Sequence, residues 1–379
     1  MLYYLSMLEE IFSELRLFQY ITFRTLGAAS TAFIVSLLIA PALIKRLKII
    51  NFGELVEDER VEGLDKRKKV GTPTMGGLLI ILSTSAATLL WAIPTNTYVL
   101  ISLGTFVLMG MIGFADDLLK IKRRNGLSVK MKFGAQLVWT ILVFGVLWAV
   151  PETRERVTDF MVPFFKNPIF QMSLIPAFLF MVVVLVGASN AVNLTDGLDG
   201  LAIGCSNSVA VAYLVLTYMA GHFNFAEYLQ VPFVKGSGEL TVFCGALLGS
   251  GLGFLWYNCH PAKIFMGDTG SLALGGAIAM LAILIKQELL LVIVGGVFVM
   301  EATSVVIQSG WFKYTRKKYG EGQRVFKCAP LHHHFEFVEK ERAMDENRTP
   351  ELVETVIVTR FWILSIIFAL IGIATLKIR

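Results

Sequence analysis

The sequence predicts an all-α, polytopic integral membrane protein with about ten transmembrane helices. Of its 379 residues, 55% are hydrophobic and only 17% are charged, which is less charge than a soluble protein of this length usually carries. The mean hydropathy is +0.66. The apolar residues come in blocks, and a membrane helix needs about 20 mostly apolar residues. Ten such blocks run near 22–44, 75–94, 98–115, 133–150, 174–192, 201–221, 240–257, 269–285, 288–311 and 358–377.

These blocks use most of the chain, which predicts a single ten-helix transmembrane domain over residues 22–379. Residues 1–21 lack the basic start of a secretory signal. Their apolar residues recur at helical spacing: Leu5, Leu8, Phe12 and Leu15. We therefore expect an interfacial amphipathic helix at the N-terminus.

Lysine and arginine predict the orientation in the membrane. They concentrate in the loops at 45–72, 116–132 and 312–357 and are sparse in the intervening loops. Ten spans with both termini outside would place all three basic loops in the cytoplasm. The net charge of +5 reflects this pattern, and no basic segment is interleaved with stacking aromatics, so we expect no nucleic-acid partner. The four cysteines do not form a disulfide framework.

With this count, four polar segments end at the cytoplasmic face. They are Asp116–Asp117 after the third span, the turn Asn193–Gly200, the turn Asn258–Ser271, and the loop carrying His332–His334. Carboxylates beside lipid are costly and ask for a reason. Glycine turns near a membrane are tolerated where they line protein or water. The sequence therefore predicts one cytoplasmic active-site cleft, and a single miscounted span would scatter these groups.

The acidic segments each allow a second interpretation. Asp116 and Asp117 suit a metal–phosphate or general-base site, or a solvated helix end paired with Lys120 at i+4 or i+3. A helix–helix turn with Asx caps explains the glycines and one Asp of Asn193–Gly200, but not two Asp with one Asn. A calcium loop there would need a terminal Glu, which is absent.

Asp268 lies in an Asp-Thr-Gly triplet, the triplet of aspartic proteases, but the flanking spans exclude that fold. It is a good N-cap for the next span, and also a carboxylate beside a helix N-terminus on a glycine turn that a ligand can approach. Both roles are compatible. Glu301 and Gln308 are seven residues apart and share a helical face, either as a buried polar pair or toward a substrate.

The triple histidine favours phosphate contact or acid–base work. Zinc binding with Cys259, His260 and Cys328 is conceivable, but adjacent histidines cannot readily all bind one ion. The turn Gly71–Gly77 follows a basic run, and it could bring Lys69 and the Thr74 hydroxyl toward a phosphate, although it is not a P-loop.

Together these groups suit Mg²⁺-assisted phosphoryl transfer between a water-soluble donor and a lipid-borne acceptor. A diphosphate and a lipid phosphate repel each other, and Mg²⁺ and lysine would offset that repulsion.

Segments 113–117, 193–200, 265–271 and 330–336 together resemble the polyprenyl-phosphate N-acetylhexosamine-1-phosphate transferases. The histidines followed by Phe335-Glu336, and the segment Gly71–Gly77, are similar to the phospho-N-acetylmuramoyl-pentapeptide translocase branch. Relatives that use N-acetylglucosamine carry an interrupted histidine pattern. The resemblance runs from about residue 66 to the end.

The resemblance implies a multi-pass enzyme of the bacterial inner membrane, usually a homodimer, with Mg²⁺ as cofactor. Such an enzyme moves phospho-MurNAc-pentapeptide from UDP-MurNAc-pentapeptide to undecaprenyl phosphate, forming lipid I and UMP in peptidoglycan synthesis. The implied catalytic residues are Asp116, Asp117, Asp268 (also the metal ligand) and His332. The implied substrate contacts are Lys69, Thr74, Asn193, Asp196, Asp199, Asn258, Gln308 and His333. Lys122, Lys130 and Lys132 are the basic residues expected near the lipid phosphate.

Two alternatives remain at this stage. One is a sister transferase that uses UDP-N-acetylglucosamine. The other is a secondary transporter, which predicts carboxylates near mid-membrane and internal symmetry. Only Glu301 lies well inside a span, and no repeat is evident.

Overall fold

The computed structural model describes residues 1–50, 71–123, 125–165, 167–345 and 352–377. Over these ranges the protein is helical apart from one small hairpin, in which β1 (Asp159–Phe160) pairs antiparallel with β2 (Phe170–Gln171). Each expected apolar block has a helical counterpart. The main helices are α1 (Ile21–Ile50), α2 (Gly77–Trp91), α3 (Thr97–Arg123), α4 (Val129–Ala149), α6 (Leu174–Thr195), α7 (Leu201–Gly221), α9 (Leu240–Asn258), α10 (Gly267–Leu284), α11 (Glu288–Val294), α12 (Gly296–Tyr319) and α14 (Val353–Ala374).

Eight helices of the described part of the chain are long and apolar enough to cross a membrane. The prediction of an all-α, polytopic membrane protein is therefore confirmed. The helix α2 is apolar but shorter. The expected block at 288–311 is not one straight span, because α11 and α12 meet at an angle of 87°. The break lies at Gly295–Gly296, and glycine pairs are a common cause of sharp kinks.

Shorter elements lie between and after these helices. They are the 3-10 helices η1 (Leu2–Leu8), η2 (Ser13–Gln19), η4 (Ser237–Glu239) and η6 (Thr375–Lys377), and the α-helices α5 (Pro151–Val157), α8 (Phe223–Tyr228) and α13 (Leu331–Asp345). The N-terminal segment therefore contains two 3-10 helices where we expected one amphipathic α-helix. Its terminal amine donates to the carbonyls of Leu89 and Leu90 at the end of α2.

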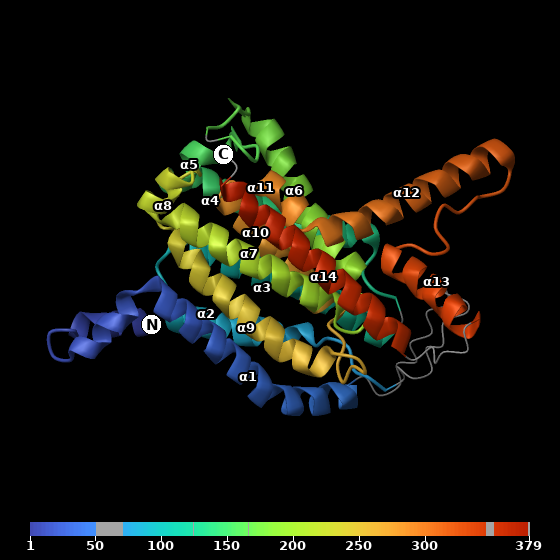
Figure 1. Ribbon diagram of the computed structural model, residues 1–379, viewed down its shortest axis with the longest axis horizontal. Helices are drawn as coiled ribbons and strands as arrows, with labels where there is room; N and C mark the ends of the chain where they lie inside the picture. The colour runs from blue at the N-terminus through green and yellow to red at the C-terminus, as the bar shows by residue number, and fades with distance from the viewer. Residues whose placement is uncertain (51–70, 124, 166, 346–351, 378–379) are drawn as a thin grey trace.

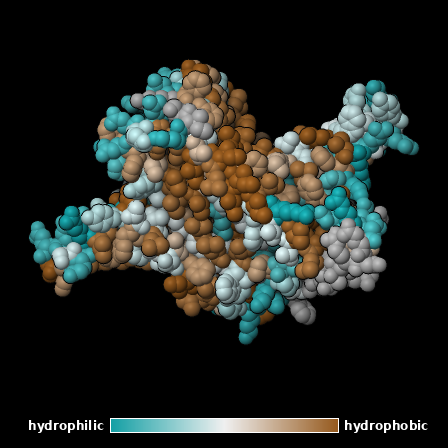
Figure 2. Space-filling view, in the orientation of Figure 1, coloured by the Kyte–Doolittle hydropathy of each residue, from teal (hydrophilic) through white to brown (hydrophobic). Residues whose placement is uncertain are grey.

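The helix α10 forms the centre of the bundle. Its residues from Thr269 to Leu284 are all buried, and it packs against α3, α6 and α2. Figure 1 shows α14 lying across α7, and α12 projecting away from the bundle with α13 beside it. Hydrophobic side chains cover the central helices, hydrophilic ones gather at the tip of α12, and the projecting N-terminal segment exposes both kinds (Figure 2). This pattern fits a bundle that is surrounded by lipid.

A row of glycines lets α9 approach α1 closely. A Cβ at Gly245 would lie 2.7 Å from the Thr25 carbonyl oxygen, and one at Gly249 would collide with the Ala29 carbonyl oxygen. Gly253, one turn further on, faces Ser36 in the same way. Small residues at four-residue spacing bring membrane helices into backbone contact, where van der Waals packing is strongest. This seam joins the two helices side by side along their length (Figure 1).

The connections divide the bundle into two ends. At one end lie the C-termini of α3, α6 and α9 and the N-termini of α2, α7, α10 and α14; we call it the carboxylate end, because Asp116, Asp196 and Asp268 lie there. The opposite end carries α5, the hairpin, α8 and the loop between α10 and α11.

Gly249→Ala is expected to destabilise the protein, because the new Cβ meets a backbone atom that cannot rotate away. Overpacking of this kind costs about 1–3 kcal/mol. Gly145→Ala on α4 is the matched control, since a Cβ there meets nothing within 4 Å. Thermal unfolding in detergent should show a lower midpoint for Gly249→Ala and an unchanged or slightly higher one for Gly145→Ala. Equal midpoints would contradict the close α1–α9 seam.

Candidate active site

The first turn of α10 is held by a carboxylate from another helix. The Asp117 carboxylate on α3 accepts three hydrogen bonds: from the Asp268 amide at 3.1 Å, from the Thr269 amide at 2.9 Å and from the Thr269 hydroxyl at 2.6 Å. The first amides of a helix have no acceptor within it, and the helix dipole favours negative charge at this end. Asp117 therefore ties the end of α3 to the start of α10.

The turn between α6 and α7 joins the same place. The Asp196 carboxylate accepts from the Gly267 amide, and Asn193 Nδ2 donates to Ser271 Oγ at 3.1 Å. Carboxylates from two different parts of the chain thus accept hydrogen bonds from the amides of Gly267, Asp268 and Thr269. The expected N-cap role of Asp268 is wrong: the helix begins at Gly267, and Asp268 lies within its first turn.

The segment before α2 packs against the other side of this turn. The amides of Gly76 and Gly77 donate to the carbonyls of Phe265 and Met266 at 2.8 and 2.9 Å, and the Phe265 amide donates to the Pro73 carbonyl at 2.9 Å. Three of the sequence motifs, which are far apart along the chain, therefore meet at the N-terminus of α10.

Glycines make this approach possible. Gly267 has a φ of +72°, which disfavours any side chain, and a Cβ there would lie 2.6 Å from Asp117 Oδ2 and 2.8 Å from Thr74 Oγ1. A Cβ at Gly113 on α3 would collide with the Asp268 carbonyl oxygen. The glycines of the motifs are thus explained by contact between backbones as well as by turns.

Two lysines lie among the carboxylates. Lys120 Nζ is 2.7 Å from Asp116 Oδ2 and 3.1 Å from Asp268 Oδ2. Lys132 Nζ is 3.3 Å from the same Asp116 oxygen and also pairs with Asp268. The other oxygen of Asp116 accepts from the Leu127 amide at 2.6 Å. These ion pairs are shielded from solvent on the carboxylate side, because Asp116 and Asp117 are buried.

The donor set fits a hard divalent cation. One oxygen from each of Asp116, Asp117 and Asp268 lies within 4.8 Å of the others. Mg²⁺ prefers carboxylate oxygens and water. Both oxygens of Asp117 already accept hydrogen bonds, so Asp116 and Asp268 have more free coordination capacity. The ammonium group of Lys132 lies against both of these carboxylates, which marks the space between them as favourable for positive charge.

The carboxyl group of Asp196 titrates near neutrality. Burial raises its pKa to about 7, and the negative charges of Asp268 and Asp117 add to the effect. The acidic residues around the N-terminus of α10 therefore repel one another, which is a further reason for the two lysines to lie there.

A second set of hydrogen bonds holds the turn at 193–200 against the segment that precedes α10. Asp199 Oδ2 lies 3.1 Å from His260 Nδ1 and accepts from the Ala262 amide at 3.1 Å. The Asp199 amide donates to Glu354 at the start of α14 at 2.9 Å. Asn258 accepts from the Gly200 amide at 3.0 Å and donates to the Ile264 carbonyl at 2.8 Å. These bonds join the turns at 193–200 and 258–266.

The three histidines have three different environments. His332 Nδ1 lies 3.2 Å from the buried Glu301 carboxylate, and His333 Nδ1 lies 3.0 Å from Glu336. His334 Nδ1 accepts from the Lys327 amide at 3.2 Å. Burial would raise the pKa of Glu336, but the hydrogen bonds from His333 and Lys340 outweigh it and lower this pKa to about 2. Neither of the two groups of candidate metal ligands in the described residues contains a cysteine or one of the three adjacent histidines, so these groups do not bring together the ligands of the zinc alternative.

The remaining predicted residues do not all lie at the N-terminus of α10. Thr74 lies beside Gly267, as described above. The Gln308 side-chain amide accepts hydrogen bonds from the Val325 and Phe326 amides and donates one to the Phe326 carbonyl, so it holds the loop before α13. Lys122 and Lys130 are exposed and form no ion pair with a described residue. Lys69 lies outside the described residues.

Several residues of this site make contacts that the sequence does not predict. Lys120 was expected only as an i+4 or i+3 partner of the Asp116–Asp117 pair, yet it also reaches Asp268. Glu354 was missed, although a glutamate at the start of an apolar span is itself a signal. Glu301 is buried as one alternative predicted, but its partner is His332 rather than Gln308.

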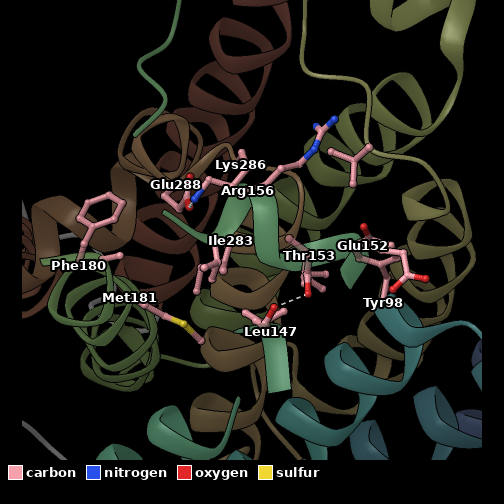
Figure 3. Close-up of a pocket in the computed structure, with 14 residues that line it drawn as sticks. Tyr98, Leu147, Glu152, Thr153, Arg156, Phe180, Met181, Ile283, Lys286 and Glu288 are labelled. Carbon is pink, nitrogen blue, oxygen red and sulfur yellow. Dashed lines mark hydrogen bonds and ion pairs between the residues drawn. The ribbon is translucent and has the colours of Figure 1, made fainter. Parts of the chain in front are cut away.

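A cavity of about 30 Å³ lies at the opposite end, between α3, α5, α6 and α10. Figure 3 shows the Lys286–Glu288 ion pair and Arg156 at its upper rim and Tyr98 with Glu152 at its side. It has room for roughly two water molecules, and none of the residues expected to act on a substrate lines it. The carboxylate end remains the candidate active site.

Comparisons with known proteins support this assignment. Residues 98–286 match the profile of glycosyl transferase family 4, and residues 69–81 match phospho-N-acetylmuramoyl-pentapeptide-transferase signature 1. Relatives named phospho-N-acetylmuramoyl-pentapeptide-transferase include one from Koribacter versatilis, 46% identical over 395 residues, 100% of this chain and 99% of the relative. One from Syntrophus aciditrophicus is 46% identical over 382 residues and 100% of both chains, and one from Maridesulfovibrio salexigens is 47% identical over 369 residues and 96% of both.

The signature contains the segment Pro73–Gly77 that packs on the first turn of α10, and the larger match contains α3, the turn at 193–200 and α10 itself. Identity of this degree over the whole length shows that the chain belongs to the phospho-N-acetylmuramoyl-pentapeptide-transferase family.

Proposed function

We propose that the protein transfers phospho-MurNAc-pentapeptide from UDP-MurNAc-pentapeptide to undecaprenyl phosphate, forming lipid I and releasing UMP. The observation that carries this proposal is the meeting of Asp116, Asp268, Lys120 and Lys132 at the N-terminus of α10. This is a site for two phosphate-bearing molecules, because it combines cationic side chains, a helix N-terminus and carboxylates that suit a metal ion. The relatives' names supply the transferred group, phospho-N-acetylmuramoyl-pentapeptide.

Asp268 and Asp116 would hold Mg²⁺, which, when bound, neutralises charge on the phosphoryl groups and so lowers their mutual repulsion. Lys120 and Lys132, which pair with these carboxylates in the structure, would be available to bind the phosphate oxygens. Asp117 keeps the first turn of α10 in place under the reacting phosphates. The second pKa of a phosphate monoester is about 6, so the lipid phosphate is already anionic and needs no strong base.

The donor side of the site is the turn at 193–200. Asn193, Asp196 and Asp199 would contact the nucleotide and sugar, with Thr74, Lys69 and His333 nearby. Asn258 and Gln308 bond the backbone of neighbouring loops, and they would shape the donor site by holding those loops. Residues 22–379 would form the single catalytic domain, and residues 1–21 would lie at the membrane interface.

The carboxylate end would face the cytoplasm of a bacterium, with both termini outside. The support is the concentration of lysine and arginine at this end of the bundle. The protein would act as a homodimer in the inner membrane, which light scattering of the detergent-solubilised protein tests by its mass.

The substrate assignment is tested by donor choice. The purified protein with undecaprenyl phosphate and Mg²⁺ should release UMP from UDP-MurNAc-pentapeptide and not from UDP-N-acetylglucosamine. Chelation with EDTA should abolish the release, and added Mg²⁺ should restore it. The reverse donor preference would assign the protein to the sister transferases, and transport without UMP release would make it a transporter.

Asp268→Asn is expected to remove activity because it halves the anionic oxygens available to the cation. A loss of about a hundredfold or more is typical when one electrostatic group of an active site is removed. Asp159→Asn at the opposite end, in the half-buried hairpin strand β1, is the matched control and should retain full turnover. Both variants should insert and unfold like the wild type. Mg²⁺-dependent turnover that survived in Asp268→Asn would contradict the role of this carboxylate.

The orientation is tested with a native cysteine. Cys259 is exposed at the carboxylate end, whereas Cys205 and Cys244 are buried. In a Cys328→Ser background, a membrane-impermeant maleimide should label Cys259 in inside-out vesicles only. A cysteine introduced at Glu155 on α5, combined with Cys259→Ser, should be labelled in right-side-out vesicles only. Labelling of Cys259 from outside would refute a cytoplasmic site.

A further inference from the structure

The environment of His332 differs from that of the other two histidines. Its side chain is 1% exposed, and it contacts Glu301, which is fully buried on α12. The Glu301 carboxylate accepts from the His332 backbone amide at 3.2 Å and lies 3.2 Å from its Nδ1. A carboxylate only accepts hydrogen bonds, so Nδ1 carries the proton and the lone pair of the neutral ring is on Nε2.

Nε2 has no hydrogen-bond partner among the described residues, although it is buried. Buried polar atoms are nearly always paired, and an exception asks for an explanation, such as a group that binds there during function. Nε2 lies against Gly197, where a Cβ would collide with it. Gly197 belongs to the turn that also carries Asp196 and Asp199, and its own backbone is exposed.

We propose that Glu301 is a positioning residue, which fixes His332 in the Nδ1–H tautomer so that Nε2 accepts a hydrogen bond from a hydroxyl group of the nucleotide-sugar donor. This inference rests on the proposed function, since it takes the turn at 193–200 as the donor site. Gly197 covers Nε2 in this structure, so the proposal requires the turn at 193–200 to shift when the donor binds. The missing side chain at Gly197 is what allows the ring to pack directly against this turn.

The charged groups around His332 favour the neutral ring. Burial lowers the pKa of His332, the nearby ring of His333 adds to this, and Glu301 and Glu336 act in the opposite direction without reversing it. Asp196 and Asp199 lie on the turn packed against the ring. The neutral form therefore predominates at cytosolic pH and is lost as the pH falls through the His332 pKa. Replacing the Glu301 charge lowers that pKa further.

The tautomer can be measured in the wild-type protein without activity. In lipid nanodiscs, ¹⁵N-histidine NMR, with His332→Gln for assignment, should show a protonated Nδ1 and an unprotonated Nε2. Adding UDP-MurNAc-pentapeptide without lipid acceptor should move the Nε2 resonance. A protonated Nε2, or a resonance that the donor leaves unchanged, would overturn the proposal.

The kinetic test uses Glu301→Gln, with Glu341→Gln as the matched control on α13, where Glu341 pairs with Lys327 and is exposed. Loss of the carboxylate that orients a metal-bound histidine costs roughly ten- to hundredfold, and we expect a factor of the same size for His332. Glu301→Gln should lower kcat/KM by that factor and move the acidic limb of its pH profile to lower pH, while Glu341→Gln should match the wild type. A loss with an unmoved pH profile would reduce Glu301 to a structural residue. Absence of UMP release from the wild type would instead refute the proposed function and leave the tautomer measurement valid.

Discussion

The structure depends on how the first turn of α10 is satisfied. A helix that begins inside a protein leaves amides without acceptors, and burying them unpaired is costly. Here Asp117 and Asp196, from two different parts of the chain, accept from Gly267, Asp268 and Thr269. The same bonds that remove this cost also fix α3 and the α6–α7 turn around Asp268. Stability and site assembly therefore rest on the same interaction.

This arrangement concentrates negative charge, and the lysines are its counterpart. Lys120 and Lys132 approach Asp116 and Asp268 from α3 and α4, so the site holds cations and anions in alternation before any substrate binds. Phosphate groups compete with the carboxylates for the lysines, and a divalent cation competes with the lysines for the carboxylates. The ion pairs thus keep the charges of the site paired before a substrate binds. They also leave the lysines free to exchange carboxylates for phosphates, and the carboxylates free to exchange lysines for a divalent cation.

Much of the fold follows from the sequence because a transmembrane helix depends on the summed hydrophobicity of many residues and not on any single one. Apolar blocks of span length gave the helices, and the count of spans placed Asp116, Asp196, Asp268 and His332 at one end of the bundle. The bend between α11 and α12 was missed because Gly295–Gly296 lies within an apolar block and hardly changes its composition. The glycine seam of α9 was not predicted: the four-residue spacing of Gly245, Gly249 and Gly253 is a signal for close packing, but it does not identify α1 as the partner. The role of Asp117 could not be derived, because its hydrogen bonds are to backbone amides on a helix far along the chain.

Amide hydrogen exchange at the start of α10 shows whether Asp117 holds this turn. Each bond to a charged acceptor is worth about 1.5–3 kcal/mol, so the Asp268 and Thr269 amides should be strongly protected in the wild type. In Asp117→Ala they should exchange at least about tenfold faster, while amides in the middle of α10 keep their protection. Unchanged exchange at Asp268 and Thr269 would show that Asp117 does not hold this turn, and the account of how the site is assembled would be wrong.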